Sequence, residues 1–154
     1  MSAQTHSEYH PGSEARPIRV AIIDDTEDLR FLLRASLTRG GMEVVGEAGD
    51  GLAGIAMVRE TQPDIILLDL GMPVMDGQTA LPHLLAAVPD THVIVLSGFG
   101  ADLLVQQLLD SGAVGYIEKG HSLSRIATYI QDTYQGPLPI ERPPGPVLRL
   151  VHSR

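Results

Sequence analysis

Five polar residues that can take part in metal or phosphoryl chemistry stand at the ends of apolar segments: Asp24, Asp25, Asp69, Ser97 and Lys119. Carboxylates held close together repel one another unless a cation joins them. Their hard oxygens suit Mg²⁺, which also takes water and phosphate oxygens. A carboxylate can attack phosphorus to form an aspartyl-phosphate, while a hydroxyl and an ammonium group neutralise the phosphoryl oxygens. These residue types predict magnesium-assisted phosphoryl transfer, provided that the fold brings them together.

Apolar runs and helical patterns alternate along the chain around these residues. The runs that we expect to be strands span 19–23, 42–47, 65–68, 92–96 and 114–117. The segments with helical spacing of apolar residues span 27–39, 52–60, 77–88, 101–111 and 122–135. The pattern is a strand followed by a helix, repeated five times.

This alternation predicts the fold class. Parallel strands need helical crossovers, and helices on both faces of a sheet bury its strands completely, as the continuously apolar runs require. With right-handed crossovers the result is an α/β, doubly wound, three-layer domain. In such a sheet the site lies beyond the carboxyl ends of the strands, which is where the five polar residues stand.

Composition limits the classes of function. Of 154 residues, 44% are hydrophobic, enough for one domain with its own core. The absence of cysteine excludes disulfides, cysteine-ligated metals and thiol catalysis. A net charge of −8 argues against a nucleic-acid or membrane surface. The amino terminus lacks the order of a signal peptide, so we expect a cytoplasmic protein.

Two terminal segments lack the patterns of the domain, which we expect at 18–135. Residues 1–17 are polar and aperiodic, which predicts a disordered tail. Residues 136–154 hold five prolines and predict an extended tail. This second tail has no helix-turn-helix pattern and only three basic residues, so we do not expect this chain alone to bind DNA.

Four motifs follow the apolar runs in order. They are Ile-Ile-Asp-Asp (22–25), Leu-Leu-Asp-Leu-Gly-Met-Pro-Val-Met-Asp-Gly (67–77), Val-Leu-Ser-Gly (95–98) and Gly-Tyr-Ile-Glu-Lys (115–119). Over residues 18–135 the chain resembles the response-regulator receiver domains of two-component signalling, including the chemotaxis receivers. The resemblance implies a flavodoxin-like sandwich with strand order 2-1-3-4-5.

The resemblance also implies roles at the metal site. Asp69 would be the phosphoacceptor. Asp24 and Asp25 would bind Mg²⁺ as an acidic pair, joined by the Asp69 carboxylate and the main-chain carbonyl of Gly71. The phosphoryl group would come from a phosphohistidine on a sensor histidine kinase or a histidine phosphotransfer protein.

Further roles concern the switch. By the resemblance, Ser97 is the switch hydroxyl, Tyr116 the switch aromatic and Lys119 the phosphate-binding lysine. Tyr116 would move inward and change a partner-binding face made by the fourth helix, fifth strand and fifth helix. Such a protein is a stand-alone, self-phosphorylating switch rather than a turnover enzyme, and a homodimer is compatible with it.

Two alternatives stay open. Gly49, Gly51 and Gly54 form a G-x-G-x-x-G motif after a strand, with Asp69 at the distance expected of a dinucleotide fingerprint. That interpretation gives the acidic pair, the serine and the lysine no role. The chain could also be the receiver part of a larger regulator.

Two residues depart from the family pattern. Gly120 stands where the family usually has a proline after the lysine, which puts the geometry of that loop in question. Pro82 falls inside the third expected helix, where it favours a kink or a late start.

Overall fold

The computed structural model describes residues 16–98, 102–120 and 123–134. The expected tails lie outside these residues, except for Arg16 and Pro17. The strands are β1 (Arg19–Ile23), β2 (Glu43–Ala48), β3 (Ile65–Asp69), β4 (His92–Ser97) and β5 (Gly115–Glu118). The helices are α1 (Glu27–Arg39), α2 (Gly51–Thr61), α3 (Gly77–Ala87), α4 (Asp102–Asp110) and α5 (Leu123–Thr133). The expected elements are all present, with ends that differ by a residue or two.

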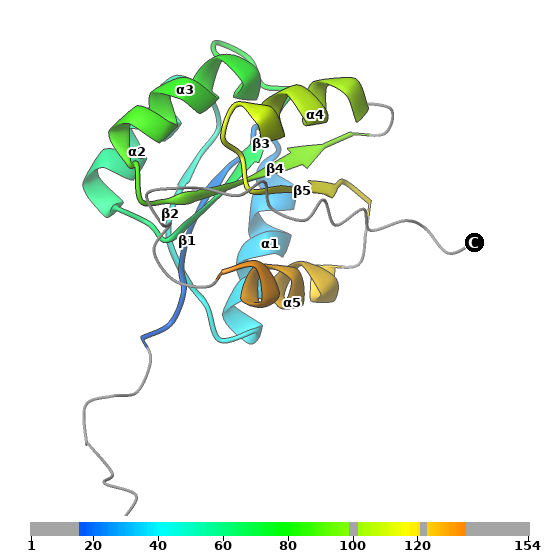
Figure 1. The fold of residues 1–154 in the computed structure, drawn as a ribbon. Coiled ribbons are helices and arrows are strands. Elements are labelled where there is room, and N and C mark those ends of the chain that lie inside the picture. Colours follow the sequence, from blue (N-terminus) through cyan, green and yellow to red (C-terminus); the bar gives the residue numbers. More distant parts are fainter. Residues whose placement is uncertain (1–15, 99–101, 121–122, 135–154) are drawn as a thin grey trace, which may run out of the picture.

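The strands form one parallel sheet in the order β2-β1-β3-β4-β5, which confirms the predicted doubly wound fold. Helices α2, α3 and α4 cover one face, and α1 and α5 cover the other (Figure 1). From β1 the chain crosses to β2 on one side, whereas β3, β4 and β5 extend the sheet on the other. The topological switch point therefore lies between β1 and β3.

Strand β3 shows why the strands are continuously apolar. Ile66 and Leu68 pack into the core beneath α2, α3 and α4, whereas Ile65 and Leu67 pack into the core beneath α1 and α5. All four side chains are fully buried, and each contributes about 1.5–3 kcal/mol to folding. The apolar run ends at Asp69, the residue at the carboxyl end of this central strand.

Helix α3 accommodates its proline without starting late. The helix begins at Gly77, and the Asp76 side chain accepts a hydrogen bond from the Thr79 amide at 2.8 Å as an N-cap. Pro82 lies inside the helix, so the late start suggested by the sequence is wrong. Among the helices of the described ranges, none has the length and apolar character needed to span a membrane.

Candidate functional site

The carboxyl edge of the sheet carries the residues that the sequence singles out. Asp69 and Ser97 are the last residues of β3 and β4, while Asp24 and Lys119 directly follow β1 and β5. Asp24 and Asp69 thus flank the switch point between β1 and β3. The fold brings residues far apart in sequence to the crevice where α/β sheets bind ligands.

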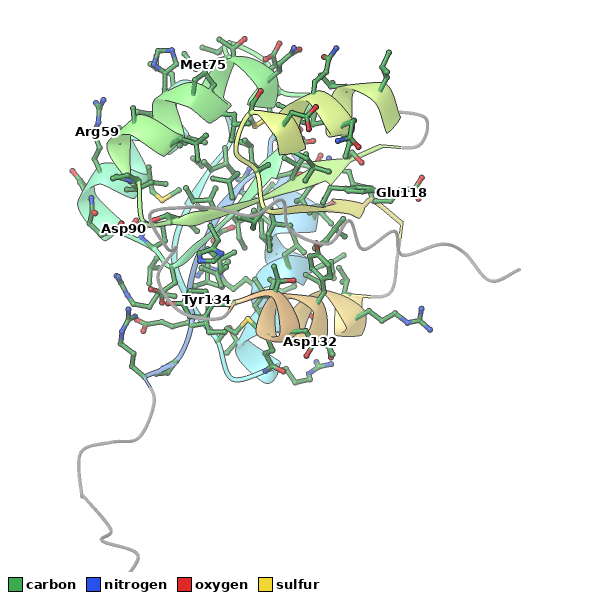
Figure 2. All side chains as sticks on the ribbon, viewed as in Figure 1. Arg59, Met75, Asp90, Glu118, Asp132 and Tyr134 are labelled. Atoms are coloured by element: carbon green, nitrogen blue, oxygen red, sulfur yellow. The ribbon has the colours of Figure 1, made fainter. Side chains whose placement is uncertain are left out.

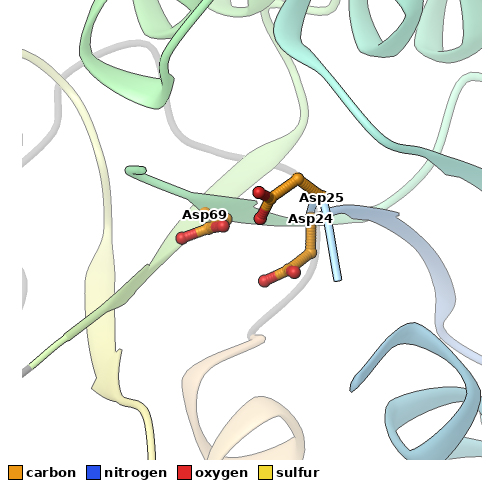
Figure 3. A group of neighbouring side chains, drawn as sticks. All are labelled: Asp24, Asp25 and Asp69. Atoms are coloured by element: carbon orange, nitrogen blue, oxygen red, sulfur yellow. The ribbon is translucent and has the colours of Figure 1, made fainter. Parts of the chain in front are cut away.

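Asp24, Asp25 and Asp69 form a cluster of carboxylates (Figure 3). One oxygen from each lies within 4.8 Å of the others. Asp24 and Asp69 are buried, whereas Asp25 is exposed. The Thr26 amide donates to Asp24 Oδ1 at 2.8 Å, which ties that carboxylate to its own loop. The cluster combines two buried carboxylates with one that is open to solvent.

Lys119 supplies the positive charge of the site. Its Nζ atom lies 2.9 Å from Asp69 Oδ1 and 3.1 Å from Asp24 Oδ2. Its main-chain amide donates to the Ser97 carbonyl at 2.7 Å, so the end of β4 helps to position it. An ammonium is a compact point charge and can lie between two carboxylates.

Burial and nearby charges shift the pKa values of Asp69 and Lys119. Burial raises the pKa of Asp69 to about 6, and the nearby Asp24 charge acts in the same direction. The Lys119 ammonium and the Gly71 amide, which donates to Asp69 Oδ1 at 3.3 Å, oppose this rise. Burial lowers the pKa of Lys119, but its close contacts with the Asp69 and Asp24 carboxylates outweigh burial and hold that pKa above its usual value.

The donor set fits a divalent cation. Among the described residues, two buried carboxylate oxygens, Asp24 Oδ2 and Asp69 Oδ2, have no hydrogen-bond partner. The first has only its charge contact with Lys119. One ammonium also leaves a cluster of three carboxylates with a net negative charge. A hard cation that accepts carboxylate oxygens and keeps other positions open would offset both features, as Mg²⁺ does.

Comparison with known proteins decides the family. The sequence model of the response regulator receiver domain matches residues 20–131. The chain belongs to this family. It is therefore a receiver domain of two-component signalling, as its motifs indicate.

Individual relatives agree with this assignment. The transcriptional regulatory protein LiaR of Bacillus subtilis is 39% identical, with 88% of this chain and 66% of LiaR covered. The chemotaxis protein CheY of Thermotoga maritima is 34% identical, with 70% and 90% covered. A CheX–CheY–BeF₃–Mg²⁺ complex from Borrelia burgdorferi matches with a TM-score of 0.71 and 28% identity over 75% of this chain and 88% of that one. The chain spans about half to two thirds of the length of the curated transcription regulators that it matches.

The structure places the remaining candidate residues around the receiver site. Ser97 is buried at the end of β4, one position beyond Leu96, the residue in register with Asp69. Tyr116 is also buried and packs in the core beneath α2, α3 and α4. Gly71 contacts the site through its amide. The switch roles and the Gly71 carbonyl as a metal ligand stay predictions.

Gly120 gives the loop after Lys119 a geometry of its own. Its φ of +102° lies in the left-handed region, which the ring of a proline cannot reach. The departure from the family pattern therefore has a structural consequence. The Lys119 ammonium nevertheless reaches both carboxylates.

The glycine motif of the dinucleotide alternative has a packing role in the receiver fold. A Cβ on Gly51 would lie 2.7 Å from the Met75 carbonyl oxygen, and one on Gly54 would lie 2.6 Å from a methyl carbon of Ile23. These glycines let α2 approach β1 and the segment before α3. Asp69, which would bind a ribose in that alternative, contacts Lys119 instead.

Sequence reasoning passed over one residue that touches the site. The Arg30 guanidinium, on α1, donates to the Asp24 main-chain carbonyl at 2.6 Å. Its position six residues after Asp24 carries no recognisable motif. A contact to a main-chain atom depends on how the helix packs, so side-chain types alone do not predict it.

Proposed function

We propose that this receiver domain accepts a phosphoryl group on Asp69 from a phosphohistidine of a sensor kinase or phosphotransfer protein. The observation that carries the proposal is the state of the Asp69 carboxylate. Oδ1 is held by Lys119 and by the Gly71 amide, whereas the buried Oδ2 has no hydrogen-bond partner among the described residues. One oxygen is held by two partners, and the lone pairs of the other have no partner among the described residues.

In the proposed step, an Asp69 oxygen attacks phosphorus and a new P–O bond forms. The P–N bond to the donor imidazole breaks, and its electron pair returns to the nitrogen, which takes up a proton. Mg²⁺ bound by the three aspartates would neutralise the phosphoryl oxygens and the cluster. The Lys119 ammonium, now 2.9 Å from Asp69 Oδ1, would contact a phosphoryl oxygen.

We propose further that the phosphoryl group shifts a two-state equilibrium. Ser97 and Lys119 would bind its oxygens and favour one arrangement of the carboxyl ends of β4 and β5. Tyr116, buried in the core that α4 also covers, would report that arrangement to the face made by α4, β5 and α5. The size of the switch equals the difference in interaction free energy between the two states. The domain works as a self-phosphorylating signalling switch, not as a turnover enzyme.

A second candidate is that the chain acts as the receiver part of a larger transcription regulator. This is favoured by its match to LiaR, of which it spans 66%. The output would then be contact with a DNA-binding domain rather than with a separate protein. Both candidates share the same chemistry at Asp69.

Treatment with acetyl phosphate and Mg²⁺ tests the proposal. Intact-mass measurement should show one added phosphoryl group on the unmutated protein and none on Asp69→Asn. A matched control is Asp64→Asn, at the other end of β3, which should be labelled like the unmutated protein. Labelling that persists in Asp69→Asn would sink the proposal.

A further inference from the structure

Arg30 contacts the acidic pair, Asp24 and Asp25, through a main-chain atom. Its Nη1 atom donates to the Asp24 carbonyl at 2.6 Å. That carbonyl belongs to the peptide that joins Asp24 to Asp25. Because a peptide unit is planar, a group that fixes its carbonyl also fixes the direction in which the next residue leaves.

Glu47, on β2, anchors this arginine. Arg30 Nε lies 3.5 Å from Glu47 Oε1, and the two side chains are only 20% and 21% exposed. Arg34, one turn later on α1, pairs with the same glutamate but is 53% exposed. Glu47 thus offsets the charge of Arg30, which can lie close to a cation site without strong repulsion.

Strand β2 therefore holds the Asp24 backbone at two points. The Asp24 amide donates directly to the Ala48 carbonyl at 3.0 Å. The Asp24 carbonyl is held through Arg30 and Glu47. Asp25 itself is exposed, so the orientation of the Asp24–Asp25 peptide determines where its carboxylate points.

We propose that Arg30 is a positioning residue for the divalent cation. By fixing the peptide between the acidic residues, it keeps the Asp25 carboxylate within 4.8 Å of the Asp24 and Asp69 carboxylates. This inference rests on the proposed Mg²⁺-dependent function. Groups that orient metal ligands from behind change metal affinity by about 10- to 100-fold when they are removed.

Substitution Arg30→Met separates positioning from charge. Methionine keeps an apolar stem but cannot donate to the Asp24 carbonyl. Loss of a positive charge near the cation should by itself tighten Mg²⁺ binding, whereas loss of positioning should weaken it by about 10-fold. The dissociation constant is measured on the folded protein from the NMR shift of the Gly71 amide during MgCl₂ titration.

Two further variants complete the experiment. Arg34→Met removes the other Glu47 partner and should leave the Mg²⁺ dissociation constant within about two-fold of the unmutated value. Arg30→Lys keeps a donor and the charge, and should bind with intermediate affinity. Unchanged or tighter binding by Arg30→Met, or equal weakening by Arg34→Met, would overturn the inference. If the unmutated protein shows no Mg²⁺ binding, the proposed function itself fails.

The unmutated protein supplies a second measurement should Arg30→Met not fold. The Arg30 Nε–H signal should shift during the same titration with the midpoint of the Gly71 amide. The Arg34 Nε–H signal should stay in place. An Arg30 signal that does not respond while Gly71 does would contradict a positioning role.

Discussion

Strand β3 has an aspartate at each end, and the two carboxylates differ in how many of their oxygens have hydrogen-bond partners. Asp64, just before the strand, makes a two-point ion pair with Arg16 at 2.8 and 2.9 Å and accepts the Arg19 amide at 2.9 Å. Asp69, the last residue of the strand, leaves Oδ2 without a hydrogen-bond partner among the described residues. Their side chains are 11% and 4% exposed, so burial alone does not explain the contrast. Figure 2 shows Tyr134 and Glu118 toward opposite ends of the strands. Tyr134 interacts with Asp64, and Glu118 is the last residue of β5, directly before Lys119.

The difference is visible in the pKa values. Burial on its own raises the pKa of Asp64, but hydrogen bonds from Arg16, the Arg19 amide and Tyr134 outweigh it and hold that pKa below its usual value. At Asp69 the effect of burial exceeds the opposing effects of Lys119 and the Gly71 amide, and the pKa rises to about 6. The Asp64 carboxylate has enough hydrogen-bond partners to stabilise its negative charge, which favours the folded state. The other end has fewer partners than its charge requires, which favours reaction with a cation and a phosphoryl group.

The largest expected effect is on the rate of phosphorylation at the Asp69 end of β3. Asp25→Asn should slow labelling by acetyl phosphate about 100-fold or more, because the cation loses a carboxylate. It should also raise the metal-free melting temperature, because fewer like charges crowd the cluster. Intact-mass time courses and thermal melts with and without Mg²⁺ check both effects. A lower metal-free melting temperature together with an unchanged Mg²⁺ response would show that the clustering is wrong.

A substitution at Asp64, the other end of β3, should mainly lower the free energy of unfolding. Asp64→Asn keeps the shape of the side chain but removes the charge that pairs with Arg16. It also leaves one acceptor oxygen where the Arg16 guanidinium and the Arg19 amide use two. We expect a loss of about 1–2 kcal/mol in the free energy of unfolding at pH 7. Urea denaturation measures it, with labelling of Asp69 unchanged as the control. A variant as stable as the unmutated protein would remove the structural half of the comparison.

The two ends should also differ in how pH affects stability. A carboxyl with a raised folded pKa contributes stability that is present below its unfolded value of 3.8 and is lost as pH rises through about 6. Asp69→Asn should therefore stabilise the metal-free protein by about 1–2 kcal/mol at pH 7 and by little at pH 4. Asp64 has the opposite sign: its contribution is present above 3.8 and is lost as pH falls through its lowered pKa. Equal effects of Asp69→Asn at both pH values would contradict this account.

The smallest expected effect concerns the carboxyl-terminal segment. Deleting residues 137–154 keeps Arg16, Asp64 and Tyr134, and five prolines cannot join the sheet interior. The melting temperature and the labelling of Asp69 should both stay within experimental error. A large drop in melting temperature would mean that the segment belongs to the core and that the expected boundary near residue 135 is misplaced.

The sequence predicts the fold and the carboxyl end of β3 better than the amino end. Continuous apolar runs mark buried strands, and Asp24, Asp69 and Lys119 are recognisable because each interrupts or follows such a run. The Asp64–Arg16 pair joins residues 48 positions apart, and Arg16 falls in a segment that the sequence assigns to a tail. Arg30 acts on a main-chain carbonyl. Such contacts depend on tertiary packing, which residue types and spacing do not determine.

The most direct test of the central claim locates the phosphoryl group. After labelling with acetyl phosphate and Mg²⁺, borohydride reduction converts a phosphorylated aspartate to homoserine, and peptide mass mapping identifies its position. The account predicts homoserine at position 69 alone, with Asp24, Asp25 and Asp64 intact. Homoserine at any other aspartate, or labelled protein with an unmodified Asp69, would contradict the assignment of Asp69 as the reactive end of β3.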